Sequence, residues 1–269
     1  MTPPTRTWNS RSTDYCACSL LLRVKRIPPS AHASPLCALV FGGALLASTA
    51  FSFADPTILD DFEGGSEGHF GSLPTLSGTN RNITSATADQ SNLLFYSGLG
   101  SEHITVNPQN PGTAPDFPST NYRLRFLSGG GTPANNVNIG ATGYVGYFLR
   151  TSTPGLVTAP GLDDGAALEL GVFQNVIADN AWHLYQFNLA DANQWDPFAG
   201  TGPNGSIEGP TVTIDSIFIQ GLTANGTTDV SLDTVAYNPN GDLTTLVPEP
   251  GSCALLSFAG LALLARRKR

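Results

Sequence analysis

The chain has 269 residues, of which 41% are hydrophobic and 13% are charged. Its charge is unevenly placed: residues 55–247 contain four arginines, no lysine and nineteen acidic residues, which gives a formal charge of −15. A stretch this acidic is a poor binder of nucleic acid and of anionic membranes, because both are polyanions. It suits a hard cation such as calcium, which prefers carboxylate and carbonyl oxygens as ligands.

Cysteine is confined to the two ends of the chain. The four cysteines are Cys16, Cys18, Cys37 and Cys253, so none lies between residues 55 and 247. Disulfide bonds are therefore excluded from that stretch. Roughly 190 residues are enough to bury a self-sufficient hydrophobic core without covalent cross-links.

An apolar run near the N-terminus spans residues 35–54 (PLCALVFGGALLASTAFSFA) and follows a basic segment. Small residues occupy the two positions that a signal peptidase inspects just before Asp55. Residues 1–54 are therefore predicted to be a signal peptide region, cleaved between Ala54 and Asp55. The alternative is a permanent transmembrane helix, which is disfavoured because glycine, serine and threonine interrupt the run.

The segment ahead of this apolar run is unusually long for a signal peptide. Met1 stands 34 residues before the run, whereas a start near Val24 would give a compact signal with Lys25 and Arg26 as its positive region. Bacteria also start translation on codons that otherwise encode valine. We therefore predict that residues 1–23 are a mis-assigned start.

Between the two ends, nine short segments alternate between apolar and polar residues or are rich in β-branched and aromatic residues, which predicts strands. These segments are residues 57–62, 92–96, 103–106, 122–127, 144–150, 167–173, 182–189, 212–219 and 230–237. Turn signals such as Pro154-Gly155 and Pro160-Gly161 separate them. The pattern predicts an all-β fold, a single jelly-roll-like β-sandwich at residues 55–237, with a linker at residues 238–247.

The first and last predicted strands carry acidic motifs, LDDFEG at residues 59–64 and VSLDTV at residues 230–235. These motifs resemble the corresponding strands of galactose-binding-like and carbohydrate-binding jelly rolls, in which such acids often share a structural calcium ion. The resemblance implies that Asp61 or Glu63 binds calcium together with Asp233. An ion there would also neutralise part of the negative charge. The alternative is that these acids stand at strand ends and face water.

Neighbouring carboxylates are the candidates for acid–base chemistry of the kind that cleaves glycosides. They are Asp60, Asp61 and Glu63, and the pair Asp163 and Asp164. Adjacent acids in loops are usually solvated, and no serine lies in a nucleophile elbow. We therefore assign no catalytic residue and expect a protein that is not an enzyme.

Carbohydrate binding normally needs an exposed aromatic ring as a platform for the sugar face. Trp195 follows Asn193 and Gln194 in a predicted loop and is the better candidate for such a ring, with Tyr147 second. Trp182 alternates within a predicted strand and is expected in the core.

The C-terminus combines Pro248, Glu249 and Pro250 with an apolar segment at residues 251–265 and four basic residues at 266–269. Fifteen residues span roughly 22 Å as a helix, which is short of the ~30 Å hydrocarbon core of a bilayer. Residues 248–269 resemble the PEP-CTERM sorting signal of Gram-negative and related bacteria. In that family an exosortase, a membrane cysteine peptidase, recognises the tripeptide and removes the tail during export.

Together these features predict an exported bacterial protein, processed by signal peptidase and exosortase, with transient membrane insertion through its C-terminal helix. We expect it at the cell surface or in the extracellular matrix as a non-enzymatic structural or adhesive module, with exopolysaccharide as a candidate ligand. The alternative is a secreted carbohydrate-active enzyme of the glycoside hydrolase or lyase type. Nucleic acid is not an expected partner, and calcium is the only expected cofactor.

Overall fold

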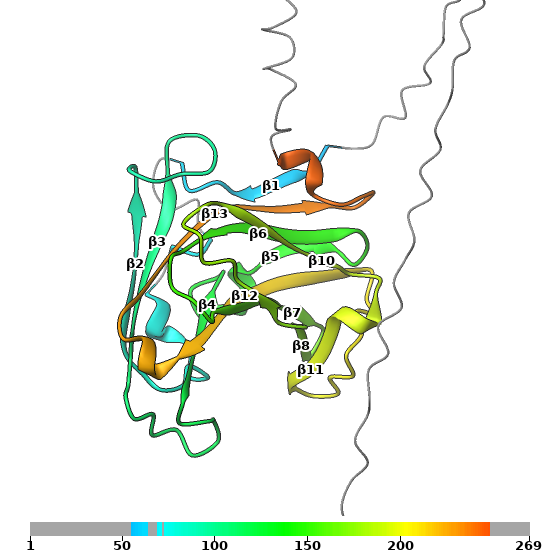
Figure 1. The fold of residues 1–269 in the computed structure, drawn as a ribbon. Helices are drawn as coiled ribbons and strands as arrows, with labels where there is room; N and C mark the ends of the chain where they lie inside the picture. Colours follow the sequence, from blue (N-terminus) through cyan, green and yellow to red (C-terminus); the bar gives the residue numbers. More distant parts are fainter. Residues whose placement is uncertain (1–54, 64–68, 72, 248–269) are drawn as a thin grey trace, which may run out of the picture. The chain divides into compact units, whose positions relative to one another are not determined.

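A computed structural model describes residues 55–63, 69–71 and 73–247, and in it these residues form two antiparallel β-sheets (Figure 1). The predicted all-β sandwich is confirmed. The predicted signal region up to Ala54 and the sorting residues Pro248, Glu249 and Pro250 lie outside the described residues, and Asp55 is the first described residue. Among the described residues, no helix is long and apolar enough to cross a membrane.

The first sheet, called sheet A, contains the first and last strands of the described chain. Its strand order is β10-β6-β13-β3-β2, and β1 pairs with β13. The strands are β1 (Thr57–Asp60), β2 (Ile83–Ser91), β3 (Ser101–Pro108), β6 (Tyr144–Arg150), β10 (His183–Asn188) and β13 (Thr228–Asn238). The first and last strands of the domain are therefore neighbours, as their resemblance to jelly-roll strands implies.

The second sheet, called sheet B, has the strand order β11-β8-β7-β12-β4, with β5 paired to β12 and β9 paired to β7. Its strands are β4 (Asn121–Leu127), β5 (Val137–Gly140), β7 (Val157–Asp164), β8 (Ala167–Gly171), β9 (Gln174–Asn175), β11 (Trp195–Gly200) and β12 (Thr211–Leu222). Within the described part of the chain, the single-turn 3₁₀ helices η1 (Pro74–Leu76), η2 (Pro133–Asn135), η3 (Ala192–Gln194) and η4 (Thr223–Asn225) lie in connections, and η5 (Thr244–Leu246) follows β13.

One hydrophobic core fills the space between the two sheets. In β4 the side chains of Tyr122, Leu124 and Phe126 are fully buried, while the alternate positions face outward. Burying a side chain of this size stabilises the fold by about 1.5–3 kcal/mol, so this inward face sets the register of the strand. The hydroxyl of Tyr147 on β6 lies 2.8 Å from Oγ1 of Thr158 on β7, which joins the sheets through the core.

Four sheet B strands, β5, β7, β9 and β11, and the sheet A strand β2 were not among the predicted segments. In β2 the sequence ITSATADQS is mostly polar, because this strand lies at the sheet edge and its residues are largely exposed. β7 contains Pro160 and Gly161, which in sequence indicate a turn. The predicted strand at residues 92–96 is wrong, because these residues lie in the loop between β2 and β3.

Residues 238–247, expected to be a linker, begin in β13 and continue along the domain. The side chain of Leu243 is fully buried, and its N–H donates to Oε1 of Gln186 on β10 at 2.7 Å. A Cβ atom on Gly146 would lie 2.9 Å from Leu243 Cδ1, so the glycine leaves the room that this side chain occupies. The segment is therefore packed against sheet A.

Glu102 gives this fold an expected pH dependence. Its pKa is raised from 4.5 to about 7, chiefly because the carboxyl group on β3 is buried and also because the charges of Asp89 and Asp60 lie nearby. The folded state then holds a proton that the unfolded chain has released. The free energy of unfolding should therefore fall as the pH rises from about 4.5 to about 7 and level off above that range.

We expect Glu102→Gln to raise the free energy of unfolding by roughly 1–3 kcal/mol at pH 8 and to flatten its pH dependence. Urea unfolding at several pH values measures both effects. Glu208→Gln, at an exposed position, is the matched control and should leave the profile unchanged. If the free energy of unfolding of the Glu102→Gln chain changed with pH as steeply as that of the parent chain, Glu102 would not be the source of the pH dependence.

Candidate functional site

The outer face of sheet B is concave, because its two edges approach each other. β11 and β4 lie at opposite edges of the sheet, which in a flat sheet would be roughly 19 Å apart. Yet the ring of Phe198 on β11 lies 5.1 Å from that of Phe218 on β12, and Arg123 on β4 lies 5.1 Å from the Phe198 ring. The register of β11 shifts between Pro197 and Ala199, and such bulges bend a strand.

Arginines and aromatic rings fill one half of this concave face, and we call this cluster the arginine–phenylalanine seam. The guanidinium of Arg123 lies between two rings, 4.9 Å from that of Phe117 and 5.1 Å from that of Phe198. Arg125 lies 5.8 Å from the ring of Phe218. Cation–π contacts of partly buried guanidinium groups stabilise such packing, so the seam holds the sheet in its curved form.

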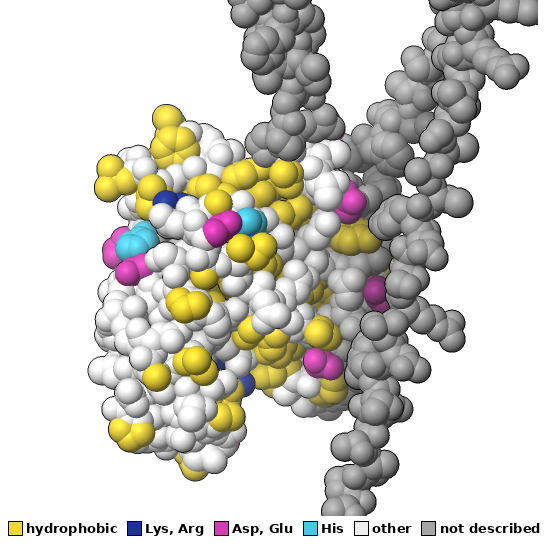
Figure 2. Space-filling view, in the orientation of Figure 1, with side chains coloured by type: hydrophobic (Ala, Val, Ile, Leu, Met, Phe, Trp, Pro, Cys, Tyr) yellow, Lys and Arg dark blue, Asp and Glu magenta, His cyan; other side chains and the backbone are white. Residues whose placement is uncertain are grey.

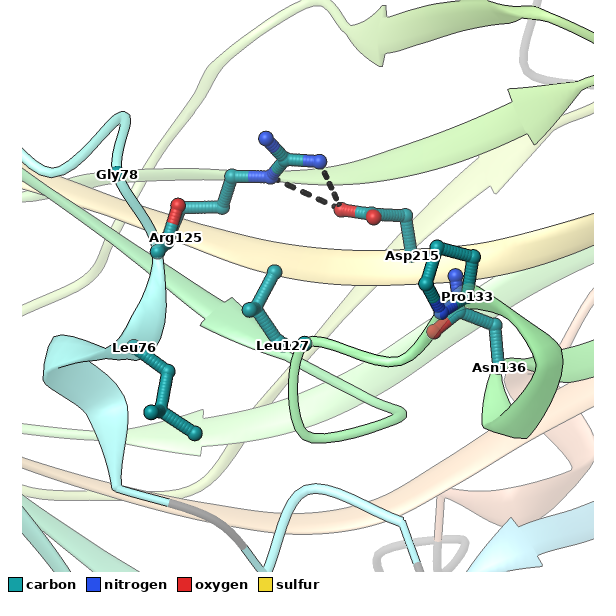
Figure 3. Close-up of a pocket in the computed structure, with 9 residues that line it drawn as sticks. Leu76, Gly78, Arg125, Leu127, Pro133, Asn136 and Asp215 are labelled. Atoms are coloured by element: carbon teal, nitrogen blue, oxygen red, sulfur yellow. Dashed lines mark hydrogen bonds and ion pairs between the residues drawn. The ribbon is translucent and has the colours of Figure 1, made fainter.

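The other half of the concave face is open and contains two adjoining pockets, which we call the sheet B groove. The first has a volume of about 260 Å³ and is lined by residues that include Leu76, Arg125, Leu127, Pro133, Asn136 and Asp215 (Figure 3). The second has a volume of about 370 Å³ and is lined by residues that include Pro133, Asn138, Asp163 and Thr213. Pro133 belongs to both pockets.

An ion pair forms the polar wall of the first pocket. Nη2 and Nε of Arg125 donate to Oδ2 of Asp215 at 2.6 and 2.9 Å (Figure 3), and only 13% and 10% of the two side chains are exposed. Nε of Arg125 also lies 3.2 Å from Oγ of Ser216. Removing one partner of a pair this buried costs about 3–5 kcal/mol, so both side chains are fixed parts of the wall.

A second carboxylate, Asp163 on β7, belongs to the adjoining pocket. Burial raises the pKa of its carboxyl group, and the charge of Asp215 raises it further. Nδ2 of Asn136 donates to Oδ2 of Asp163 at 3.0 Å and lowers the pKa in turn. The structure thus brings Asp163 together with Asp215 on the neighbouring strand.

The sequence paired Asp163 with its neighbour Asp164 instead. Asp164 is used otherwise: its Oδ2 accepts the N–H of Glu208 at 2.7 Å and its Oδ1 accepts that of Gly209 at 3.3 Å. Asp215 was missed as a site residue. Its signal was present, since it is the one charged residue in the apolar run of residues 212–219.

Neither predicted sugar-platform residue presents a ring to solvent. Trp195 was expected in a loop, and this prediction is wrong, because the residue begins β11 with 3% of its surface exposed. Its Nε1 donates to the carbonyl of Asn188 at 2.9 Å. Tyr147 is 1% exposed within the core. Trp182, expected in the core, is half-buried beside Tyr96 with the ring centres 6.3 Å apart.

The candidate calcium ligands hold a loop. Oδ2 of the fully buried Asp233 accepts the N–H groups of Tyr96 and Ser97 at 2.6 and 3.2 Å. Oε1 of Glu63 accepts those of Leu99 and Gly100 in the same loop. Asp233 and Glu63 are thus engaged with the same segment, residues 92–100.

The carboxylate oxygens of Asp233 and Glu63 that would bind a metal ion already accept hydrogen bonds from backbone N–H groups. Asp61 has its own backbone partner, because its Oδ1 accepts the N–H of Glu63 at 3.1 Å. In residues 55–63, 69–71 and 73–247, no group of three or more His, Cys, Asp or Glu side chains is arranged to hold a metal ion. Calcium at Asp61, Glu63 and Asp233 stays a prediction.

No protein-family model matches the chain, and no curated protein matches it. Several solved structures are similar in shape. A promiscuous carbohydrate-binding module of the β-sandwich superfamily has 11% identity and a TM-score of 0.42, over 67% of this chain and 61% of that one. The chain thus spans about three fifths of that structure.

Two further structures are similar at 10% identity. The family 11 carbohydrate-binding module of a Clostridium thermocellum cellulase matches over 70% of this chain and 96% of its own, with a TM-score of 0.40. A xylan-binding domain from Paenibacillus barcinonensis matches over 70% and 97%, with a TM-score of 0.34. Likeness at this level assigns no ligand to the present chain.

Proposed function

We propose that residues 55–247 form a non-catalytic polysaccharide-binding module of an exported bacterial protein. The observation that carries this proposal is the sheet B groove. Small-molecule sites are concave and largely preformed, with apolar walls and a few placed polar groups. The groove has this form, because its curvature is held by the packed arginine–phenylalanine seam and its floor is a hydrogen-bonded sheet.

The lining of the groove suits the two kinds of surface that a sugar presents. Amide, carboxylate and hydroxyl groups that bind sugar hydroxyls come from Asn136, Asn138, Asp163 and Thr213, and apolar surface for sugar C–H groups comes from residues such as Pro133. Asn136 is fixed by its bond to Asp163, so part of the polar set is preorganised. Preorganised groups lose less entropy when a ligand binds.

The two ends of the chain supply the proposed destination. The signal region up to Ala54 would direct export and be removed by signal peptidase before Asp55. The segment at residues 248–269 would insert in the membrane transiently until an exosortase acts at Pro248-Glu249-Pro250. The processed module would then act at the cell surface or in the extracellular matrix, where exopolysaccharide is its proposed ligand.

The pair of Asp163 and Asp215 favours a second candidate, a glycoside-cleaving enzyme, because such enzymes use two carboxyl groups with different pKa values. The raised pKa of Asp163 suits a general acid. Against this candidate, Asp215 accepts two bonds from Arg125 and Asp163 is bonded to Asn136, so both carboxylates serve the wall of the groove. Release of reducing sugar from a bound polysaccharide, lost in Asp163→Asn, would establish the enzyme.

The binding proposal predicts a defined response to truncation of the groove. Asn138 is exposed and lines the second pocket, so Asn138→Ala should leave the melting temperature unchanged. We expect it to weaken polysaccharide binding by about 3- to 10-fold, the usual effect of one lost hydrogen bond. A glycan array followed by titration calorimetry on the best ligand measures the change.

Asn240→Ala is the matched control, because this asparagine is also exposed but follows β13 of sheet A. It should bind as tightly as the parent chain. Equal weakening by both substitutions, or no binding to any polysaccharide on the array, would refute the groove as a sugar site.

Calcium at the first and last strands predicts sensitivity to chelators. If Asp61 and Asp233 share an ion, EDTA should lower the melting temperature by several degrees, because a ligand that binds only the folded state stabilises it. Asp61→Asn should remove this chelator effect. A melting curve that EDTA does not change would rule the ion out and leave the polysaccharide site standing.

A further inference from the structure

The loop between β2 and β3 exposes an uncharged apolar surface. Leu93 is 88% exposed, Leu99 71%, Leu94 42% and Phe95 40%. Figure 2 shows hydrophobic side chains standing out from the surface over this loop. Residues 92–99 contain no charged side chain, although the domain around them is strongly acidic. We call these four residues the apolar tip.

The apolar tip is held out of the core by strong bonds behind it. Asp233 and Glu63 bind four backbone N–H groups of the loop, those of Tyr96, Ser97, Leu99 and Gly100. The ring of Tyr96 also stacks on that of Phe148 on β6, with the centres 3.6 Å apart. Charge-assisted bonds of this kind are about twice as strong as neutral ones, so the loop is fixed with its leucines outward.

The apolar tip lies where the chain leaves the domain. The hydroxyl of Tyr96 donates to the carbonyl of Leu246 at 2.5 Å, and Figure 1 shows the β2–β3 loop and η5 at the same end of the domain. The next residue, Val247, is 40% exposed and apolar. Only residues 248–250 then separate it from the apolar segment at 251–265, and a few extended residues span at most about 14 Å.

We infer that the apolar tip rests on the surface of the membrane in which residues 251–265 are inserted. This inference rests on the proposed insertion of that segment. Leucine and phenylalanine side chains enter the boundary between headgroups and acyl chains, and the short connection gives the tip a high effective concentration there. The negative charge of the domain makes zwitterionic lipid the fitting surface, because an anionic surface would repel it.

The test compares two tryptophan substitutions in residues 55–269, the chain that is proposed to remain after signal peptidase has acted. Leu93→Trp marks the apolar tip, and Leu73→Trp marks a residue that is 66% exposed just before η1, away from the tip. Both chains are reconstituted in phosphatidylcholine vesicles with brominated acyl chains, which quench tryptophan at the membrane. For each variant the measured quantity is the increase in quenching relative to the parent chain. We expect this increase to be at least about threefold larger for Leu93→Trp than for Leu73→Trp.

A second measurement uses the chain without substitutions, so its result cannot be caused by the introduced tryptophans. Amide hydrogen exchange at Leu94 and Phe95 should slow in vesicles compared with vesicle-free solution.

Extraction with alkaline carbonate, which removes proteins that are not inserted in the membrane, separates the two parts of the inference. If the chain stays with the vesicles but both tryptophans are quenched equally, the contact between the apolar tip and the lipid is wrong, while the inserted segment and the polysaccharide site stand. If carbonate removes the chain, the insertion is wrong and the contact of the tip with lipid is wrong as well. If emission of the Leu93→Trp chain shifts with protein concentration without vesicles, a second copy covers the tip, which also overturns the inference.

Discussion

The contact between Phe198 and Phe218 determines the shape on which the sheet B groove depends. It brings the edge strand β11 over the centre of its own sheet, and the guanidinium of Arg123 closes the contact from the opposite edge. A flatter sheet would present the same polar residues on an open surface, where water competes for every hydrogen bond. The groove is therefore a result of packing on the outer face, whereas the core between the sheets sets only which residues point there.

Carboxylates hold the loops of this domain where cations are scarce. Residues 55–247 have no lysine, and two of the buried acids, Glu169 and Asp233, bind backbone N–H groups instead. Glu169 accepts the amides of Asn204 and Gly205 at 2.8 and 2.9 Å, just as Asp233 accepts those of Tyr96 and Ser97. Because each acid spans two consecutive amides of a distant loop, the negative charge of the chain is partly what fixes its loops.

The sequence pattern predicted several strands that have one buried face. It predicted β6 with its exact bounds, because Val145, Tyr147 and Leu149 alternate into the core. The pattern missed β2, because this exposed edge strand is mostly polar. It missed β7, because Pro160 indicates a turn in sequence although it lies inside a paired strand. The groove was out of reach, since Asp163 and Asp215 are 52 positions apart and meet only through the pairing of β7 with β12. The spacing of these residues in the sequence does not predict that β7 pairs with β12.

The groove and the apolar tip use opposite faces of the sandwich, which makes the two assignments compatible. The tip is anchored to the outer face of sheet A, because Tyr96 stacks on Phe148, a residue of β6 outside the hydrophobic core cluster. The groove opens on the outer face of sheet B. A domain that rests on lipid through the tip would thus keep its groove free for a polysaccharide before and after the C-terminal segment is removed. Binding would then need no rearrangement on release, as the rigid seam and the fixed loops also imply.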